Sequence, residues 1–205
     1  MNESDLHWML LKEGGQDTLI DFPDSGGVYV FLLSGYPFYV GTAKSFRRRL
    51  RTHRKLFRSL DRTFIDPALL RDSTTPWVEV VKGATPQELA RWVFVAGSKT
   101  EDRPEVLKKS QAFWEGLTIV GAALSDSSPR LLKGVELSLQ RFFIEYSQRD
   151  GRKLPLIPGL RYTFFGKQES VAEISCVRHT ASAALPAVFR EMLQAQQDRS
   201  KTEKV

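Results

Sequence analysis

Two tyrosines and an arginine-rich stretch are the residues of this chain whose types and spacing can do chemistry. Tyr29 and Tyr39 stand ten residues apart, in the segments Gly-Val-Tyr (27–29) and Tyr-Val-Gly (39–41). A phenol has a pKa near ~10, so it acts as a base only beside a cation or a metal ion. Residues 44–62 supply cations: nine Lys or Arg and one Asp, a net +8 in a chain of total charge +6. Such a local charge indicates a polyanion as partner, because neutralising phosphates releases counterions. The alternative is a solvated basic helix face.

The hydrophobic pattern predicts a β-hairpin under the two tyrosines. Residues 28–33 read as a strand, residues 34–37 as a tight connection and residues 38–41 as the return strand. With so short a connection, the two strands should pair antiparallel. The even spacing of Tyr29 and Tyr39 within the hairpin can place both rings on one face of the sheet.

A basic helix is predicted next, from residue 44 or 45 to about residue 60. Its apolar positions leave the arginines mostly on the other side, and they are Phe46, Leu50, Phe57 and Leu60. Arg49 carries a permanently charged, two-pronged group that suits a phosphate. His53 lies four residues later, on the same helical face, and can donate to a phosphate or take a proton near neutral pH. His7 and His179 are isolated and are interpreted as structural.

The remaining pattern predicts a domain that mixes strands and helices. The expected elements are a helix over 4–12, a strand over 77–81, a helix from 85 through 92, a strand over 117–124, a helix over 130–146, a strand over 171–177, a helix over 185–194 and a disordered tail from 196. Cys176 is the only cysteine, so an internal disulfide and a cysteine-rich zinc site are excluded, and we interpret it as a buried structural thiol. No run approaches the ~20 apolar residues of a membrane span, and a bacterial-type cytoplasm is expected.

The two tyrosine segments, with Arg49 ten and His53 fourteen residues after Tyr39, resemble the GIY-YIG nuclease superfamily. The match covers about residues 26–54 well, and beyond them only the general order of strands and helices. It implies an α/β fold of the α+β kind, with a small antiparallel central sheet flanked by helices. It also implies an endonuclease that hydrolyses DNA phosphodiester bonds. Tyr29 and Tyr39 would orient or deprotonate the attacking water, and Arg49 would bind the scissile phosphate. The residues expected to bind nucleic acid are Lys44, Arg47, Arg48, Arg51, Arg54 and Lys55.

The resemblance further implies one metal-ligating glutamate on a later helix, followed by an asparagine. Glu136 is the preferred ligand of one Mg²⁺ or Mn²⁺; a second alignment places Gln140 at that position, and Glu88 is the third choice. The asparagine has no counterpart, since Asn2 is the only one in the chain. A divalent ion in an oxygen site needs a carboxylate. Two functions therefore stay open, a metal-dependent endonuclease and a DNA-binding protein that has lost cleavage.

The expected domain organisation follows from the long interval between His53 and Glu136, which implies an insertion at about 56–116. The division is an N-terminal helix (1–20), a nuclease domain (21–165), a C-terminal strand and helix (166–195) and a disordered tail (196–205). Three tryptophans in the insertion are interpreted as core anchors: Trp77, Trp92 and Trp114. The expected partner is double-stranded or branched DNA, with a homodimer as the way to cut both strands and with no membrane.

Overall fold

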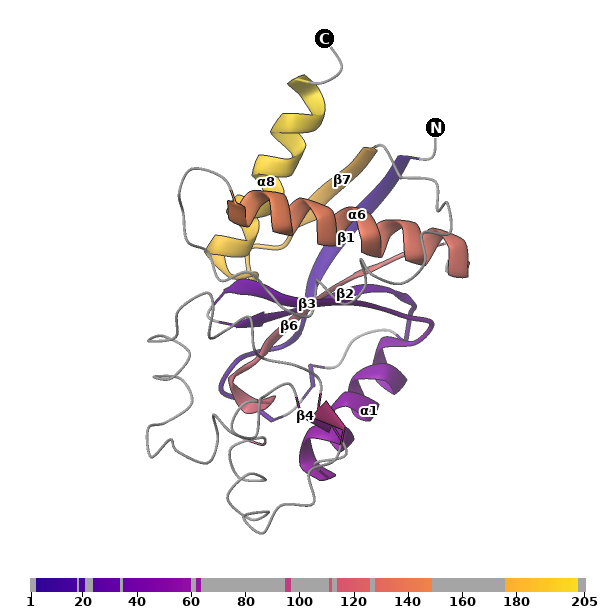
Figure 1. Cartoon of the computed structure of the whole chain (residues 1–205), viewed down its shortest axis with the longest axis vertical. Helices are drawn as coiled ribbons and strands as arrows, with labels where there is room; N and C mark the ends of the chain where they lie inside the picture. The colour runs from indigo at the N-terminus through magenta and orange to yellow at the C-terminus, as the bar shows by residue number, and fades with distance from the viewer. Residues whose placement is uncertain are drawn as a thin grey trace.

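The fold of the computed structural model is a mixed α/β arrangement built on one five-stranded sheet (Figure 1). The described residues are 3–17, 19–20, 24–33, 35–59, 62–63, 95–96, 111, 114–125, 128–148 and 176–202. The sheet contains β1 (Glu3–Lys12), β2 (Gly27–Leu33), β3 (Tyr36–Ala43), β6 (Thr118–Ala123) and β7 (Cys176–Ala181). The longer helices are α1 (Phe46–Ser59), α6 (Pro129–Gln148) and α8 (Ala187–Thr202). A separate two-stranded sheet pairs β4 (Arg62–Thr63) with β5 (Val95–Ala96).

The sheet is mixed rather than purely antiparallel, which corrects the expectation from sequence. Its strand order is β3-β2-β6-β1-β7. Three of the pairings are antiparallel, whereas β7 runs parallel to β1. A parallel neighbour requires a long crossover, and here the chain from β1 to β7 supplies it.

The predicted hairpin of β2 and β3 is confirmed. Gly35 turns the chain between the strands with φ of +86°, a left-handed conformation that glycine adopts at little cost. In the register that results, Tyr29 pairs with Gly41, and Phe31 pairs with Tyr39. The two tyrosines therefore occupy diagonal positions on one face of the sheet.

The predicted helix over residues 4–12 is wrong, because Glu3–Lys12 forms the strand β1. This strand lies between β6 and β7, so its backbone groups are paired on both sides. Leu6 and Trp8 point into the core, and the register shifts between Leu10 and Lys12. The shift is an irregularity of the β-bulge kind, and it lets both Leu11 and Lys12 become fully buried.

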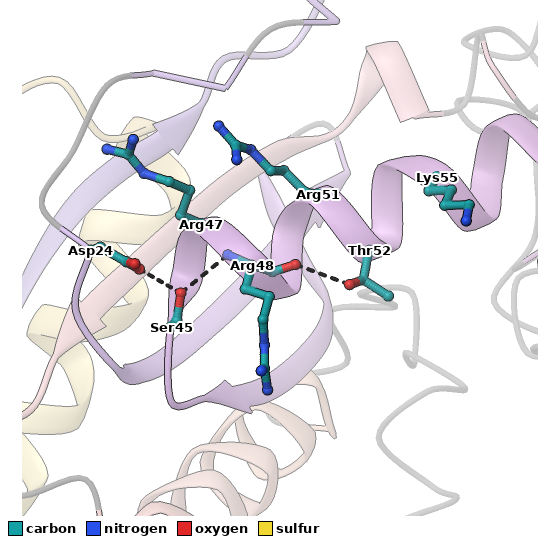
Figure 2. Close-up of a pocket in the computed structure, with 7 residues that line it drawn as sticks. All are labelled: Asp24, Ser45, Arg47, Arg48, Arg51, Thr52 and Lys55. Atoms are coloured by element: carbon teal, nitrogen blue, oxygen red, sulfur yellow. Dashed lines mark hydrogen bonds between the residues drawn. The ribbon is translucent and has the colours of Figure 1, made fainter.

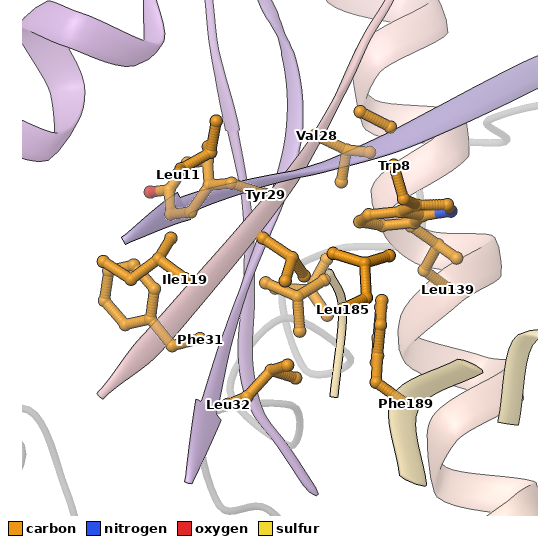
Figure 3. Packing of buried hydrophobic residues seen from close by; sticks show 14 of the residues in the cluster. Trp8, Leu11, Val28, Tyr29, Phe31, Leu32, Ile119, Leu139, Leu185 and Phe189 are labelled. Atoms are coloured by element: carbon orange, nitrogen blue, oxygen red, sulfur yellow. The ribbon is translucent and has the colours of Figure 1, made fainter. Parts of the chain in front are cut away.

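Opposite faces of the sheet carry different helices, with α6 on one side and α1 on the other (Figure 1). Trp8, Ala122 and Val28 lie in one row across β1, β6 and β2. On their face, the Phe189 ring of α8 packs edge-on against Trp8 with centroids 5.2 Å apart. The neighbouring row contains Tyr29 and Gly121 and faces α1. Figure 3 shows these two groups of core side chains on either side of the strands.

Three helices predicted from the sequence are present, with different ends. The helices over 44/45–60 and 130–146 are confirmed as α1 and α6. The last helix, α8, extends to Thr202, so the expectation of a disordered tail is wrong for residues 196–202. The strand predicted over 171–177 overlaps β7 only at Cys176 and Val177, which are the first two residues of β7.

Several predictions fall outside the described residues. They include the strand over 77–81, the helix over 85–92 and, within the insertion at 56–116, Trp77 and Trp92. Trp114 is described, and its ring is buried against Phe57 and Phe31, as expected of a core anchor. No helix in the described part of the chain is both long and apolar enough to cross a membrane.

Candidate active site

The two tyrosine rings lie side by side on the face of the sheet that α1 covers. Their centroids are 6.0 Å apart. Gly41 makes this possible: a Cβ atom there would stand 2.6 Å from the Tyr29 hydroxyl and 2.7 Å from a ring carbon of Tyr39. Phe31, two residues after Tyr29 on the same face, packs beneath both phenols with centroids 5.5 and 5.4 Å away. We did not predict Phe31 as part of the site, although its even spacing from Tyr29 was the available signal.

Helix α1 delivers an arginine and a histidine to the Tyr29 hydroxyl. The Arg49 Nε–H donates to that oxygen over 3.2 Å, and His53 Nε2 lies 2.8 Å from the same oxygen. Arg49 and His53 are one helical turn apart, and Phe46 and Leu50 anchor the helix beside them in the core. The structure thus brings together four residues predicted as catalytic, and we call Tyr29, Tyr39, Arg49 and His53 the phenol patch.

Burial determines the charge state of the phenol patch. Tyr29 is 0% exposed, and desolvation, with a smaller contribution from Tyr39, raises its pKa well above its ordinary value despite the opposing Arg49. Tyr29 is therefore a neutral phenol near pH 7. Arg49 is half-buried; burial alone lowers its pKa, but interaction with Tyr29 and Tyr39 outweighs burial and raises it. The patch therefore combines one neutral buried phenol with one permanent cation.

Glu136, the predicted metal ligand, is not part of this network. It lies on α6, which covers the other face of the sheet (Figure 1). Its side chain is largely buried, at 8% exposed, and its carboxylate accepts from Lys133 Nζ at 3.1 Å and from Gln140 Nε2 at 3.3 Å. The two alternative ligands of the sequence alignment are thus bonded to each other. Glu88, the third choice, lies outside the described residues.

A divalent ion does not fit the donors that the described residues gather. Nowhere among them do three His, Cys, Asp or Glu side chains come together. The one candidate carboxylate, on Glu136, is compensated by the ammonium of Lys133 in an ion pair of 3.1 Å. Oxygen sites for Mg²⁺ depend on uncompensated negative charge to offset dehydration. We therefore assign no chemical step to a metal ion.

The outer side of α1 carries a second candidate site, an open hollow of about 350 Å³ (Figure 2). We call it the basic hollow, and its lining residues are Asp24, Ser45, Arg47, Arg48, Arg51, Thr52 and Lys55. Ser45 caps the helix: its Oγ accepts from the Arg48 N–H at 3.1 Å and donates to the Asp24 carboxylate. Four of the six residues predicted to bind nucleic acid line this hollow.

The other two predicted nucleic-acid contacts lie elsewhere. Arg54 forms a two-pronged ion pair with Asp17, in which its Nε donates over 3.0 Å, and Arg58 adds a contact of 3.4 Å to the same carboxylate. This pairing lowers the pKa of the Asp17 carboxyl, chiefly through its hydrogen bond with Arg54. Arg54 therefore ties α1 to the segment after β1. Lys44 is exposed just before the helix and is not among the residues that line the hollow.

Comparisons with family models, curated proteins and solved structures find no match to this chain.

Proposed function

We propose that this chain is an endonuclease that hydrolyses phosphodiester bonds in DNA, with the scissile phosphate docked at the phenol patch. The observation that carries the proposal is the bonded set of Arg49, Tyr29 and His53, with Tyr39 packed beside it. Phosphodiester hydrolysis needs an aligned water, a route for its proton and stabilisation of charge on the phosphoryl oxygens. Each of these tasks has a suitable side chain in the patch.

Arg49 is proposed to bind the phosphate. Its charge is permanent, and its position is fixed because its Nε–H is held by the Tyr29 oxygen. A guanidinium that is oriented in advance stabilises developing phosphoryl charge without reorganising during the reaction. Half-burial strengthens this effect, since the effective dielectric constant at such a position is lower than in water.

The phenols and His53 are proposed to handle the proton. Tyr29 is fully buried and neutral, so Tyr39, which is partly exposed, is the phenol that an attacking water meets first. When His53 Nε2 carries no proton, the Tyr29 hydroxyl donates to it across 2.8 Å. Water can then give a proton to the Tyr39 hydroxyl while Tyr39 passes its own proton to Tyr29, and Tyr29 passes its proton to His53 Nε2. His53 ends the relay protonated, and neither phenol has to ionise.

A second function, DNA binding without cleavage, is favoured by two specific observations. The Tyr29 hydroxyl is removed from solvent, and the Glu136 carboxylate is bonded to Lys133 and Gln140 rather than to the phenol patch. A chain of this kind would keep the cationic surfaces of α1 and bind DNA through them. It would leave the phosphodiester bonds intact.

A nicking assay separates the two functions. Supercoiled plasmid and a branched DNA are incubated with Mg²⁺, Mn²⁺ or EDTA, and nicked and linear products are counted. The endonuclease proposal expects cleavage by the wild type, and a rate about 10²–10³-fold lower for Arg49→Ala, the loss typical of removing one charge-stabilising donor. Linear product that forms in one binding event between protein and plasmid would indicate a dimer, because one phenol patch cuts one strand.

The matched control is Arg190→Ala, which removes an exposed arginine from α8, far along the chain from the phenol patch. Its nicking rate should equal that of the wild type. Wild-type protein that binds DNA but cuts neither substrate with any metal would contradict the endonuclease and favour the second function. Glu136→Gln gives a further readout. We expect cleavage to survive this change, because the Glu136 carboxylate is bonded to Lys133 and Gln140 rather than to the phenol patch.

A further inference from the structure

We propose that the buried ammonium of Lys12 positions His53 in the phenol patch, through an aromatic wall formed by the rings of Trp114 and Phe31. The ammonium bonds to backbone carbonyl groups and not to the phenols, so Lys12 is a positioning residue rather than a catalytic one. This inference rests on the proposed function for the statement that His53 receives the proton. The position of the His53 ring can be measured by itself, in the absence of DNA.

The ammonium of Lys12 is held by three backbone carbonyl groups. Lys12 is the last residue of β1 and is 0% exposed. Its Nζ donates to the carbonyl oxygen of Leu117 over 2.6 Å, of Glu115 over 2.9 Å and of Glu13 over 3.2 Å. An ammonium has three N–H donors, and all three are used here. The cation also lies 5.5 Å from the centroid of the Trp114 ring, within reach of a cation–π attraction.

The charge of Lys12 costs free energy of folding at pH 7. None of its three hydrogen-bond acceptors is a carboxylate. Desolvation is the largest influence on this side chain and lowers the pKa of Lys12 from 10.5 to about 8, although Asp17 and Glu115 oppose the change. An apolar side chain of similar length would avoid this desolvation cost. The role of the ammonium is therefore to be sought in what it holds in place.

The ammonium joins the end of β1 to the segment that carries Trp114. On the side of β1 it binds the carbonyl group of Glu13, and on the other side it binds those of Glu115 and Leu117. A backbone bond supports the joint, because the Gly15 N–H donates to the Glu115 oxygen over 2.8 Å. The Leu117 N–H closes a turn by donating to the Trp114 oxygen over 3.3 Å. Trp114 therefore has its backbone in a turn bound by the cation and its ring beside the same cation.

Trp114 contacts one support of the His53 ring on the sheet and another on the helix. Its buried ring meets the Phe31 ring edge-on, with centroids 6.3 Å apart. Phe31 in turn packs edge-on against the His53 ring, with centroids 5.1 Å apart. On α1, Trp114 packs against Phe57, one helical turn after His53, with centroids 5.6 Å apart. In so closely packed a core, a displacement of Trp114 moves both supports, and with them the 2.8 Å contact between His53 Nε2 and the Tyr29 hydroxyl.

Loss of the Lys12 proton changes the aromatic wall. A neutral amine has two N–H donors and a lone pair, so one of the three carbonyl groups loses its partner, and the cation–π attraction disappears. Among the described residues, the other charged groups near the ammonium are Glu13, Glu115 and Asp17, with Arg54 and Arg58 paired to Asp17. Carboxylates and guanidinium groups keep their charge between pH 7 and 9, so the ammonium is the group that changes. The His53 ring is therefore expected to move as the pH rises through 8.

Nuclear magnetic resonance of the protein without DNA tests the inference. Lysine is labelled with ¹³C at Cε and histidine with ¹⁵N in the ring, and spectra are recorded from pH 7 to pH 9.5. We expect the Lys12 signal, assigned by its absence from Lys12→Met, to titrate with a midpoint near pH 8 and the His53 signals to shift with the same midpoint. In Lys12→Met, the His53 signals should stay constant over this range. His179, on the other face of the sheet, is the internal control and should not shift in either protein.

The nicking rate gives a second readout, which a purely structural role would not change. The wild-type rate should fall about tenfold between pH 7 and pH 9, because the protonated fraction of a group with a pKa of about 8 falls by that factor. Lys12→Met should cut slowly and at a constant rate over this range, whereas Lys133→Met, which removes a lysine from α6, should keep the wild-type pH dependence. The unfolded state keeps the Lys12 proton up to its pKa of 10.5, so this group makes the fold more stable as the pH rises above 8. Thermal melting at each pH verifies that unfolding is not the cause of the loss.

Three results would overturn the inference: His53 signals that do not move near pH 8, His53 signals that move alike in the wild type and in Lys12→Met, and a wild-type nicking rate that is equal at pH 7 and pH 9. If Lys12→Met does not fold, the wild type decides, by whether the His53 signals share the midpoint of the one lysine that titrates near pH 8 while His179 stays constant. A wild type that shows these shifts but cuts no DNA would remove the endonuclease proposal and leave the positioning of His53 by Lys12 in place.

Discussion

The protein buries two histidines, one on each face of its sheet, and their hydrogen bonds differ. His179 is 7% exposed; the Trp8 indole N–H donates to its Nδ1 over 2.9 Å, and its Nε2 lies 2.6 Å from Gln196 Oε1. His53 is 2% exposed and shares the Tyr29 hydroxyl with the half-buried cation Arg49. The His179 network closes within β1, β7 and α8. The network of His53 leads to a charged group that borders the surface.

The role of a buried imidazole is therefore indicated by its hydrogen-bond partners more than by its burial. His179 has a donor and an acceptor that suit the neutral ring, and desolvation lowers its pKa to about 4 even though the bond to Gln196 opposes this. It fixes packing. His53 is bonded to a hydroxyl that can pass a proton, beside a cation that can hold a phosphate. Changes around His179 should alter stability alone, and changes around His53 should alter function.

The largest expected effect is the acid sensitivity that His179 gives to the fold. Its pKa is about 4 in the folded chain and 6.5 when unfolded, so the unfolded state binds the extra proton between these values. The stability present above pH 6.5 is lost as the pH falls towards 4, by about 3 kcal/mol. Urea unfolding at pH 7.0, 5.5 and 4.0 measures this loss.

His179→Gln is the control for this titration, since an amide can accept from Trp8 and does not ionise in that range. Its unfolding free energy should vary less with pH over the same window. The Asp17 carboxyl is a separate contributor, because its lowered pKa affects stability only below its ordinary value of 3.8. Identical pH dependence in the wild type and the variant would mean that His179 is not the residue responsible.

An intermediate effect is expected on the other face, from Gly41→Ala. The new Cβ atom would lie 2.6 Å from the buried Tyr29 hydroxyl, and the ring must move away from Arg49 and His53. Overpacking of this kind costs about 1–3 kcal/mol. Thermal melting gives the loss of stability, and the nicking rate should fall with it because the phenol patch is displaced.

Gly116→Ala is the matched substitution, since a Cβ atom there meets nothing within 4 Å. Its unfolding free energy should stay within about 0.5 kcal/mol of the wild type. If the two variants were equally stable and equally active, close packing at Gly41 would not be what positions the phenols.

The smallest effect is expected from Asp17→Asn, which removes the ion pairs to Arg54 and Arg58. These side chains are partly exposed, at 34% for Arg54 and 53% for Arg58, so the loss should be below about 1 kcal/mol. Urea unfolding at 0.05 and 1 M KCl should show the difference shrinking at high salt. A fall in nicking rate beyond the change in stability would show that Arg54 acts in the site rather than in the fold.

The part of the site that could be predicted from sequence is local. The hairpin of β2 and β3 and the helix α1 occupy one stretch of chain, and their turn and periodicity are visible within a short window. Even spacing placed Tyr29 and Tyr39 on one face, and helical spacing placed Arg49 beside His53. The position of Arg54 could not be read in this way, because Asp17 is far from it in sequence.

The elements that were missed depend on partners distant in sequence. Residues Trp8, Met9 and Leu11 fit a helical stripe, and the register shift before Lys12 hides the alternation of the strand. The polar composition after Gln196 suggested disorder, yet Gln196 and Gln197 bond the side chain and backbone of His179. In both cases tertiary contacts override the local preference.

The central place of β1 has a consequence for the synthesis of the chain. This strand is made before the rest of its sheet, but one neighbour is β6 at 118–123 and the other is β7 at 176–181. The strand and its apolar side chains, Leu6 and Trp8 among them, therefore remain without β6 and β7 as neighbours while more than a hundred residues are translated. Nascent chains that stall in that interval should be the form of this protein most in need of a chaperone.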